Sequence, residues 1–410
     1  MDIRIEPKLL HGGITPPPSK SVSHRLIICA ALARGESLVS NLAFSRDILA
    51  TLSCMEGLGA AWEAVGTDAV RIRGLGGRPY AGPLPRFDCG ESGSTLRFLI
   101  PIALAVAGGG VFTGGGRLME RPQKPYFDLF DQSGILHELR DGVLTVRGTL
   151  PAGTYTLPGD VSSQFISGLL FALPLLDGDS RICLSSPLEG DGYVHLTTAA
   201  QETFGVHSAL MAAELPQYAV PGGQSYAPRD ARVEADWSQA GFWYAALALG
   251  SKLDIMDMNP QSVQGDKCIV PCFNALTRPG SVELDVSQCP DLVPPLAVMA
   301  ALREGKTRIV NAARLRIKES DRLASVTQTL NAMGAQIEEF PDSLAISGVP
   351  ALLGGVELDC CNDHRIAMMA AIAATRCAKP VVLRGADCVN KSYPRFWDDY
   401  RRLGGAADVL

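Results

Sequence analysis

Short polar clusters that run directly into apolar stretches recur six times along the chain. The apolar stretches are long enough for helices of about two to three turns. They are apolar nearly all round, so each predicted helix is buried on most of its faces. The clusters therefore stand at helix starts, where free N–H groups and the positive dipole end attract anions. They begin near Lys20, Glu91, Ser162, Asp236, Asp291 and Asn362.

A fixed spacing of roughly 70 residues between most clusters indicates a repeated supersecondary unit. Short runs between the clusters have the pattern of strands. A second repeat supports a duplicated chain, because residues 47–74 parallel residues 321–348. In both segments an amphipathic helix begins at Asp, ends in Leu/Met-Gly-Ala and is followed by a strand. The predicted strands are ESLVSNLAF, AVRIRGL, VLTVRGTL, TRIVNAARL, SLAISGV and PVVLRGA.

The length of 410 residues predicts two domains, each able to bury its own core. A Pro/Gly-rich stretch, Leu215–Arg229, separates three clusters from the other three and is the best candidate for a crossing between domains. The apolar runs are too short for a membrane span, and the N-terminus has no pattern of a signal or transit peptide. We therefore expect a protein without a membrane partner.

The eleven cysteines are scattered singly except for Cys360–Cys361, and no CxxC occurs. The six histidines show no metal-ligand spacing. We therefore expect no metal and reduced thiols, as in a cytoplasmic protein.

Charge narrows the class of ligand. The net charge is −6 and no basic stripe is present, which argues against nucleic acid as a partner. An anionic ligand must instead be bound by cations concentrated locally, and the polar clusters contain them. Together with the six helix starts, these cations predict a site for a multiply anionic small molecule. They are Lys20, Arg25, Arg97, Arg121, Lys318, Arg322, Arg365 and Lys391.

The clusters before residue 215 combine cations with small donors. Ser21 can donate a hydrogen bond to a carboxylate or phosphate, Lys20 adds charge, and Arg25 offers planar bidentate geometry. Gly93 allows close approach of the backbone to a ligand. The uncharged start at residues 162–164 suits sugar-like hydroxyls or neutral contacts to phosphate.

The later clusters mix both signs of charge. Asp291 is either a functional carboxylate or a simple helix N-cap. Lys318 and Arg322 are spaced i and i+4, which places them on one face if the segment is helical. Glu319 lies between them in a cationic environment that keeps it ionised unless desolvation opposes this.

Taken in order, these segments resemble the 3-phosphoshikimate 1-carboxyvinyltransferases (5-enolpyruvylshikimate-3-phosphate synthases). The matching segments span residues 18–397, and the most specific are SKSVSHR at 19–25, RIKESDRL at 316–323 and NDHRIAM at 362–368. The resemblance implies an α/β fold, a two-domain inside-out α/β barrel of six βαβαββ repeats, three per domain. It implies an N-terminal lobe at 13–230, a C-terminal lobe at 1–12 plus 231–410, and an active site in the interdomain cleft. The chain would then cross between lobes near His11–Ile14 and Arg229–Glu234.

The implied activity is an enzymatic transfer in the shikimate pathway of aromatic amino-acid (chorismate) biosynthesis. The enolpyruvyl (carboxyvinyl) group of phosphoenolpyruvate would pass to the 5-hydroxyl of shikimate 3-phosphate, with release of phosphate. The resemblance implies no cofactor and no metal, and a cytoplasmic monomer whose partners are these two small molecules.

Site residues are carried over one by one from the resemblance. Proton-transfer roles fall to Asp291, Glu319 and Lys20. The implied contacts to shikimate 3-phosphate are Lys20, Ser21, Arg25, Ser162, Ser163, Gln164, Ser185, Asp291 and Lys318. The implied contacts to phosphoenolpyruvate are Lys20, Gly93, Arg121, Gln164, Arg322, Arg365 and Lys391.

Two positions depart from the family pattern, and two other functions remain open. Glu91 stands where the family commonly has Asn, and Phe98 where many members have Pro.

One alternative function is that of the enolpyruvyl transferase that acts on UDP-N-acetylglucosamine. That family has Asn directly after the first-cluster Lys and a mobile loop with a reactive Cys, whereas here Ser21 follows Lys20 and residues 114–124 hold no Cys. The other alternative is a catalytically silent phosphosugar- or nucleotide-binding protein on the same scaffold.

Overall fold

The computed structural model describes residues 1–77 and 80–410 and divides into two compact units. The continuous unit is Lys20–Glu234. The discontinuous unit combines Met1–Ser19 with Ala235–Leu410. Each unit has its own large hydrophobic core.

The continuous unit contains three βαβαββ repeats. In this naming η marks a short 3-10 helix. The first repeat is β14 (Ala231–Arg232), α1 (Lys20–Leu32), β3 (Glu36–Ser40), α2 (Arg46–Gly57), β4 (Ala61–Val65) and β5 (Ala69–Arg73). The second is β6 (Arg86–Asp88), α3 (Gly93–Ala107), β7 (Gly109–Thr113), η1 (Leu118–Glu120), α4 (Lys124–Ser133), β8 (Leu136–Arg140) and β9 (Val143–Arg147). The third is β10 (Thr154–Leu157), α5 (Ser163–Ala172), η2 (Leu173–Leu175), β11 (Ser180–Leu184), α6 (Asp191–Thr203), β12 (Ala209–Met211) and β13 (Gln217–Val220).

The discontinuous unit contains two full repeats and one short one. The short repeat is β2 (His11–Ile14), α7 (Trp237–Ala248), β15 (Lys252–Ile255), η3 (Gly265–Cys268) and α8 (Ile269–Leu276). The next is β16 (Val282–Asp285), η4 (Pro290–Leu292), α9 (Val293–Ala301), β17 (Lys306–Val310), η5 (Ala313–Ile317), α10 (Arg322–Ala332), β18 (Gln336–Glu339) and β19 (Leu344–Ser347). The last is β20 (Glu357–Asp359), α11 (His364–Ala374), β21 (Val381–Arg384), η6 (Ala386–Lys391), α12 (Phe396–Arg402), β22 (Ala406–Val409) and β1 (Ile3–Glu6).

One strand order is shared by the full repeats. The first two strands of a repeat are parallel and flank its first helix, as β6 and β7 do around α3. The last two strands form an antiparallel pair, and the fourth strand of the repeat pairs with the second. Gly109 of β7 thus lies opposite Arg147 of β9, which in turn pairs with Leu136 of β8. The result is the sheet order β6-β7-β9-β8, and the same order recurs as β10-β11-β13-β12 and β16-β17-β19-β18.

Distant strands complete two of the other repeats. β14 pairs in parallel with β3, and β1 lies antiparallel between β21 and β22. β2 pairs in parallel with β15 in a sheet of two strands, so within the described residues this repeat lacks the final antiparallel pair. The α/β fold with repeated sheets is therefore confirmed, with five four-stranded sheets and one two-stranded sheet in the described part of the chain. No sheet there closes into a barrel.

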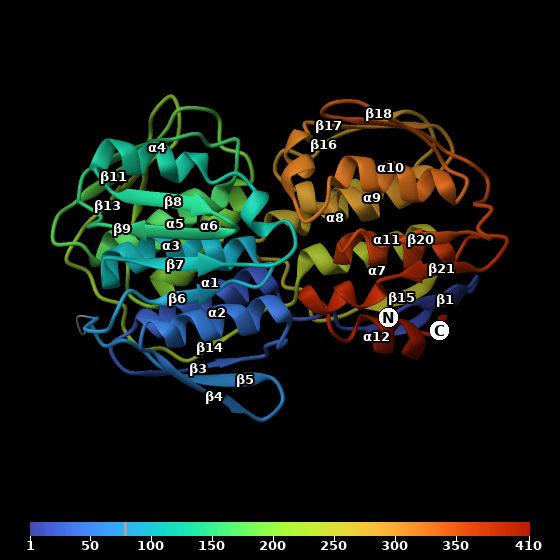
Figure 1. Ribbon diagram of the computed structural model, residues 1–410. Helices are drawn as coiled ribbons and strands as arrows, with labels where there is room; N and C mark the ends of the chain where they lie inside the picture. Colours follow the sequence, from blue (N-terminus) through green and yellow to red (C-terminus); the bar gives the residue numbers. More distant parts are fainter. Residues whose placement is uncertain (78–79) are drawn as a thin grey trace. The chain divides into compact units, whose positions relative to one another are not determined.

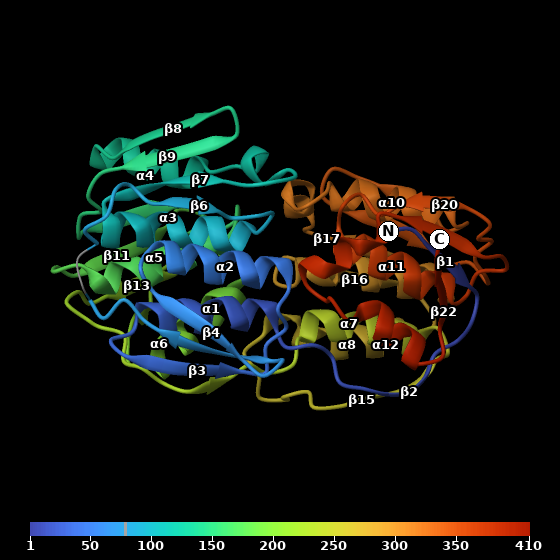
Figure 2. The same cartoon turned by 60° about the horizontal axis from the view of Figure 1, so that its bottom comes forward.

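In each unit the first helices of the repeats are central and the sheets are peripheral (Figures 1 and 2). Every residue of α9 and α11 is buried, and so are nine of the ten residues of α5. The peripheral strands instead alternate, as β10 does with the pattern exposed, buried, exposed, buried. Helices that are apolar all round can bury every face only if sheets cover them, which explains this layering.

The six predicted strands are confirmed as β3, β5, β9, β17, β19 and β21. The predicted duplication is also present: α2 and α10 have Leu58 and Met333 as their C-caps, and each C-cap is followed by a glycine with φ near +105° (Gly59 +105°, Gly334 +104°). That φ favours glycine, so the two segments stop their helices by the same means.

The chain passes between the units at Ser19–Lys20 and Glu234–Ala235. His11–Ile14, where a crossing was expected, forms β2 and pairs with β15 of the discontinuous unit. The Pro/Gly-rich stretch Leu215–Arg229 contains β13, which belongs to a sheet of the continuous unit. Among the described residues, none of the helices is both long and apolar enough to cross a membrane.

Arg303 is a buried arginine that caps the end of α8. Its guanidinium donates hydrogen bonds to the carbonyl oxygens of Leu276 (3.0 Å) and Gly280 (2.9 Å) and to that of Arg278. It also donates to Thr307 Oγ1 at 3.3 Å. The side chain thus satisfies several carbonyls that α8 and the following turn leave without backbone partners.

Replacing Arg303 with Met is expected to lower the free energy of unfolding by roughly 2–4 kcal/mol, because buried carbonyls lose their donors. Urea unfolding followed by tryptophan fluorescence measures this, since Trp237, Trp243 and Trp397 lie in the same unit. The control is Arg308→Met, whose exposed ion pair with Glu283 is worth at most about 1 kcal/mol. Equal losses in the two variants would contradict the capping role.

Candidate functional site

Hydrogen bonds join the starts of the central helices in the continuous unit. Lys20 at the start of α1 forms an ion pair with Asp47 of α2 at 2.9 Å. His24 Nδ1 lies 2.7 Å from Thr51 Oγ1, which lies 2.7 Å from Thr95 Oγ1 on α3. Burial, followed by the charges of Lys20 and Arg25, holds the pKa of His24 well below its usual value, so the imidazole is neutral. We give the name serine–arginine cluster to the polar residues at or over the starts of α1, α3 and α5: Lys20, Ser21, His24, Arg25, Arg97, Arg121, Ser162, Ser163 and Gln164.

Arg25 is a buried cation of this cluster and is held by neutral groups. Its Nε donates to Thr197 Oγ1 at 2.8 Å, and its Nη atoms donate to the carbonyl oxygens of Ser21 and Tyr193. Among the described residues no carboxylate forms an ion pair with it. Burial lowers the pKa of Arg25 to about 10, so the guanidinium remains charged at neutral pH.

Arg121 is a second buried cation, placed directly over the start of α3. A Cβ built on Gly93 would lie 2.6 Å from Arg121 Nη1 and 2.9 Å from Cζ and Nη2, so only glycine leaves room for the guanidinium. The side chain is 8% exposed, and its Nε has no hydrogen-bond partner among the described residues. In the described part of the chain its guanidinium has no ion pair. A buried cation beside free helix N–H groups is a strong attractor for an anion.

Arg97 and Gln164 join the starts of α3 and α5. Arg97 Nη1 donates to Gln164 Oε1 at 2.9 Å and to Ser162 Oγ at 3.4 Å, and Nη2 donates to the carbonyl of Pro122. Gln164 Nε2 in turn donates to Ser94 Oγ at 2.9 Å. Ser162 caps α5 through its hydroxyl. These bonds fix the side chain of Gln164, which sequence analysis had selected.

The remaining selected residues of this unit occupy the same helix starts, with one exception. Ser163 is the buried first residue of α5, and Ser21 is the second residue of α1. Ser185 is exposed and follows β11, where its backbone N–H donates to the carbonyl of Leu157 at the end of β10. Within the described residues, Ser185 is therefore linked to the segment before α5 through its backbone only. The Glu91 side chain lies against Gly116, because a Cβ built on Gly116 would lie 2.3 Å from Glu91 Oε2.

A second group of charges surrounds Arg322 in the discontinuous unit, and we call it the acidic–basic cluster. Arg322 is 1% exposed and forms ion pairs with Asp363 (2.8 Å), Asp291 (2.8 Å) and Glu319 (2.6 Å). Burial alone would lower the pKa of Arg322, but the three carboxylates outweigh it and raise the pKa above its ordinary value. The guanidinium therefore remains a fixed positive charge.

The other selected cations of this unit join the same group. Arg365 donates to Asp291 Oδ2 (2.9 Å), to the Asp291 carbonyl and to Ser238 Oγ (2.7 Å). Lys318 Nζ lies 3.4 Å from Asp291 Oδ1, and Lys391 Nζ donates to the carbonyl of Asn362 at 2.5 Å. Asp291 thus contacts three cations, far more than a simple helix cap requires.

Lys318 and Arg322 do not share a helical face, which corrects the conditional prediction from their spacing. Lys318 has extended backbone after η5, and α10 begins only at Arg322 with Asp321 as its N-cap. The Asp321 side chain accepts a hydrogen bond from the N–H of Ala324, which stabilises the helix start there. The two cations still meet, because both contact Asp291 Oδ1.

Two members of the acidic–basic cluster were not among the site residues predicted from the sequence. Asp363 is fully buried, forms an ion pair with Arg322, accepts from Ser320 Oγ and caps α11 through the N–H of Arg365. Ser238, on the first turn of α7, binds Arg365. A signal for Asp363 was present in the sequence, since an Asp directly before an apolar helix is a typical N-cap. No sequence signal linked Ser238 to Arg365, 127 residues away.

The pKa of Lys318 makes a pH-dependent test possible. Burial lowers this pKa to about 8, against the opposing effect of Asp291. A lysine is charged below its pKa and neutral above it, so the attraction of Lys318 for an anion weakens as pH rises through about 8. We expect kcat/KM for an anionic substrate to fall above that pH, by up to about tenfold per unit.

The matched variant for this test is Lys318→Arg, whose guanidinium stays charged beyond pH 12. Its pH profile is expected to lose the fall near pH 8, even if its overall activity is lower. An unchanged alkaline fall in the variant would show that another group titrates there.

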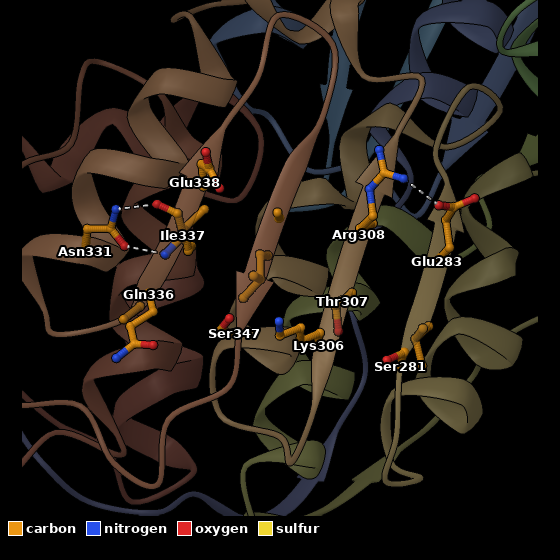
Figure 3. Close-up of a pocket in the computed structure, with 14 residues that line it drawn as sticks. Ser281, Glu283, Lys306, Thr307, Arg308, Asn331, Gln336, Ile337, Glu338 and Ser347 are labelled. Atoms are coloured by element: carbon orange, nitrogen blue, oxygen red, sulfur yellow. Dashed lines mark hydrogen bonds and ion pairs between the residues drawn. The ribbon is translucent and has the colours of Figure 1, made fainter.

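A hollow on the outer face of the sheet β16-β17-β19-β18 lies outside both clusters (Figure 3). Its rim contains Lys306, Glu338 and the ion pair between Arg308 and Glu283 at 3.3 Å. None of the selected site residues lines it. Among residues 1–77 and 80–410, no group of three or more His, Cys, Asp or Glu is placed to hold a metal ion.

Comparison with known proteins identifies the family. The model of EPSP synthase (3-phosphoshikimate 1-carboxyvinyltransferase) matches residues 5–400. The 3-phosphoshikimate 1-carboxyvinyltransferase of Clostridium beijerinckii is 44% identical, covering 99% of this chain and 98% of that protein. The enzyme of the same name from Clostridioides difficile is 42% identical, with 99% and 98% covered. The solved structure of EPSP synthase from Acinetobacter baumannii has a TM-score of 0.80 at 25% identity and covers both chains completely.

The chain therefore belongs to the EPSP synthase family, the 3-phosphoshikimate 1-carboxyvinyltransferases of aromatic amino-acid biosynthesis. This supports the first of the three functions that the sequence left open.

Proposed function

We propose that this enzyme transfers the enolpyruvyl group of phosphoenolpyruvate to the 5-hydroxyl of shikimate 3-phosphate and releases phosphate. The hydroxyl attacks C2 of phosphoenolpyruvate while C3 gains a proton, which gives a tetrahedral ketal phosphate. Loss of phosphate and of a C3 proton then forms the enol ether. The reaction needs an acid, a base and a means of binding two phosphates and two carboxylates, and no redox partner or covalent enzyme intermediate.

One observation carries the proposal: two buried guanidiniums, Arg25 and Arg121, have no carboxylate partner among the described residues. A buried cation without a counter-ion is costly, and an anionic ligand that neutralises it gains that energy on binding. Both arginines lie at helix starts, where the backbone N–H groups also favour a negatively charged ligand. We assign shikimate 3-phosphate to Lys20, Ser21, Arg25, Ser162, Ser163, Gln164 and Ser185, and phosphoenolpyruvate to Lys20, Gly93, Arg121 and Gln164.

The acidic–basic cluster supplies the rest of the proposed set. Asp291 and Lys318 bind shikimate 3-phosphate, and Arg322, Arg365 and Lys391 bind phosphoenolpyruvate. In the structure these cations are balanced by Asp291, Glu319 and Asp363 or by carbonyl groups. A bound anion would compete with the carboxylates for the same donors, which frees the carboxylates to accept protons.

Proton transfer falls to three of these groups. Asp291 and Glu319 each accept hydrogen bonds from Arg322, so both are held in fixed positions as carboxylates. Lys20 is the third, and its ammonium is held by Asp47. We propose that these residues exchange the protons of the 5-hydroxyl and of C3, as general acid and base.

We also propose that the enzyme acts in the cytoplasm as a monomer, with only these two small-molecule partners and no cofactor. All eleven cysteines are free thiols, which suits a reducing compartment. The net charge of −6 without a basic stripe is unfavourable for nucleic acid or an anionic membrane. Light scattering of the purified protein at several concentrations tests the monomer.

The deciding experiment compares phosphate release from phosphoenolpyruvate with two acceptors. Release with shikimate 3-phosphate but not with UDP-N-acetylglucosamine is the expected result. The reverse preference would assign the other enolpyruvyl transfer. Tight binding of shikimate 3-phosphate without any release would instead indicate a silent binding protein.

A further inference from the structure

Arg25 faces an aromatic ring rather than an acid. Its Cζ lies 5.1 Å from the centroid of the Phe98 ring, and both side chains are buried, at 2% and 0% exposure. Arg25 belongs to α1 and Phe98 to α3, so the contact joins the starts of two central helices. The Phe98 ring also contacts Phe171 of α5, edge to face at 5.4 Å between centroids.

The next helix repeats the arrangement. Arg97 of α3 places its Cζ 4.6 Å from the centroid of the Phe165 ring on α5. Phe165 is fully buried and contacts Tyr126 edge to face at 4.8 Å. Two arginines of the serine–arginine cluster thus lie over phenylalanines that the neighbouring helix presents.

An aromatic ring and a carboxylate can both hold a guanidinium in place, but they differ in how much of its positive charge remains available to a ligand. A carboxylate fixes the side chain but neutralises its charge, and an incoming anion must then compete with it. The face of a phenyl ring attracts the cation through its quadrupole and leaves the full positive charge in place. Aromatic support therefore suits a guanidinium that must be both rigid and available to an anion.

We propose that Phe98 is a positioning residue that holds Arg25 against its ring face, ready for the anionic groups of shikimate 3-phosphate. The inference rests on the proposed function, because it assumes that Arg25 contacts this substrate. The neutral bonds from Arg25 to Thr197, Ser21 and Tyr193 fix the rim of the guanidinium, and the ring fixes its plane.

The first test uses Phe98→Leu, with Phe171→Leu as the matched control. Both variants remove one buried ring from the same core, but within the described residues Phe171 contacts Phe98 and makes no cation–π contact with Arg25. We expect Phe98→Leu to raise KM for shikimate 3-phosphate by at least about fivefold, the effect of losing a desolvated cation–π contact. KM for phosphoenolpyruvate is expected to change less, and Phe171→Leu to leave the ratio of the two KM values unchanged.

A second test keeps the shape of the ring. Phenylalanines with one to three ring fluorines, incorporated at position 98, weaken the negative face of the ring with little change in packing. KM for shikimate 3-phosphate is expected to rise stepwise with the number of fluorines. This readout stays informative if Phe98→Leu folds poorly, because fluorination preserves the core.

The outcomes separate the inference from the proposed function. If the unaltered enzyme releases no phosphate from shikimate 3-phosphate and phosphoenolpyruvate, the function itself is wrong. If it turns over normally but KM for shikimate 3-phosphate is indifferent to fluorination, or rises equally in Phe98→Leu and Phe171→Leu, Phe98 is only a core residue and the inference is overturned.

Discussion

An Arg322→Ala variant is expected to lose more than about tenfold in kcat/KM, which corresponds to at least about 1.4 kcal/mol of transition-state stabilisation. Arg322 is almost completely buried and donates to Asp291, Glu319 and Asp363. Removing it takes away a proposed ligand of phosphoenolpyruvate and the group that holds both proposed proton-transfer carboxylates. Steady-state phosphate release with each substrate varied in turn measures the loss.

The same substitution is expected to lower stability, because the buried Asp363 and the half-buried Asp291 and Glu319 lose their common cation. The loss of one partner from a buried ion pair typically costs about 3–5 kcal/mol. Arg322→Lys provides a variant that retains the charge: one ammonium cannot reproduce the planar contacts to three carboxylates, so activity falls while most of the stability remains.

The control for Arg322 is Arg384→Ala. Arg384 also bridges two carboxylates, Asp2 and Glu357, but its side chain is 55% exposed. Its removal is expected to change neither kcat/KM nor stability by a measurable amount. Unchanged kinetics in Arg322→Ala would remove that arginine from the proposed site.

A Gly93→Ala variant is expected to raise KM for phosphoenolpyruvate by roughly tenfold to a hundredfold, the usual effect of moving a binding group by about 1 Å. The new methyl group would lie 2.6 Å from Arg121 Nη1, so the guanidinium must leave its place over the start of α3. Gly93 is the first residue of the helix, where alanine is at least as favourable as glycine. The defect should therefore appear in binding rather than in folding.

Gly57→Ala is the matched control, since a Cβ there would meet its nearest atom, Phe87 Cε1, at an ordinary 3.5 Å. Both changes add one methyl group to a helical glycine of the continuous unit. A normal KM for phosphoenolpyruvate in Gly93→Ala would show that Arg121 can move without cost, or that it does not bind this substrate.

The helices and strands of the repeats could be predicted because their signals are local. The start of α11, for example, follows from Asp363, three residues before the apolar run that begins at Ile366, and the end of α10 follows from Met333-Gly334. The extended backbone at Lys318, which separates it from the helix that begins at Arg322, could not be predicted. Arg316, beside them, forms ion pairs with both Asp321 and Glu339 and so anchors the segment before α10. Glu339 belongs to β18, and the spacing of residues in the sequence does not show that this strand lies near Arg316.

The candidate site was predictable in its cations and not in their surroundings. Arg25 and Arg322 were both selected, yet one lies over Phe98 and the other among three carboxylates. That difference depends on which helix packs beside each arginine, and a single sequence does not show it. Phe98 was noticed only as a departure from the family pattern, and its contact to Arg25 required coordinates.

The placement of β1 has a consequence for how the chain acquires its shape during synthesis. Ile3 pairs with Leu383 and with Val409, so β1 must wait for partner strands that are synthesised much later. Lys20–Glu234 holds all the strands of its own sheets and can become native while the rest is still being translated. The other unit must close a loop of almost the whole polypeptide, which makes it the late and slow step. A nascent enzyme would thus bear its serine–arginine cluster well before its acidic–basic cluster exists.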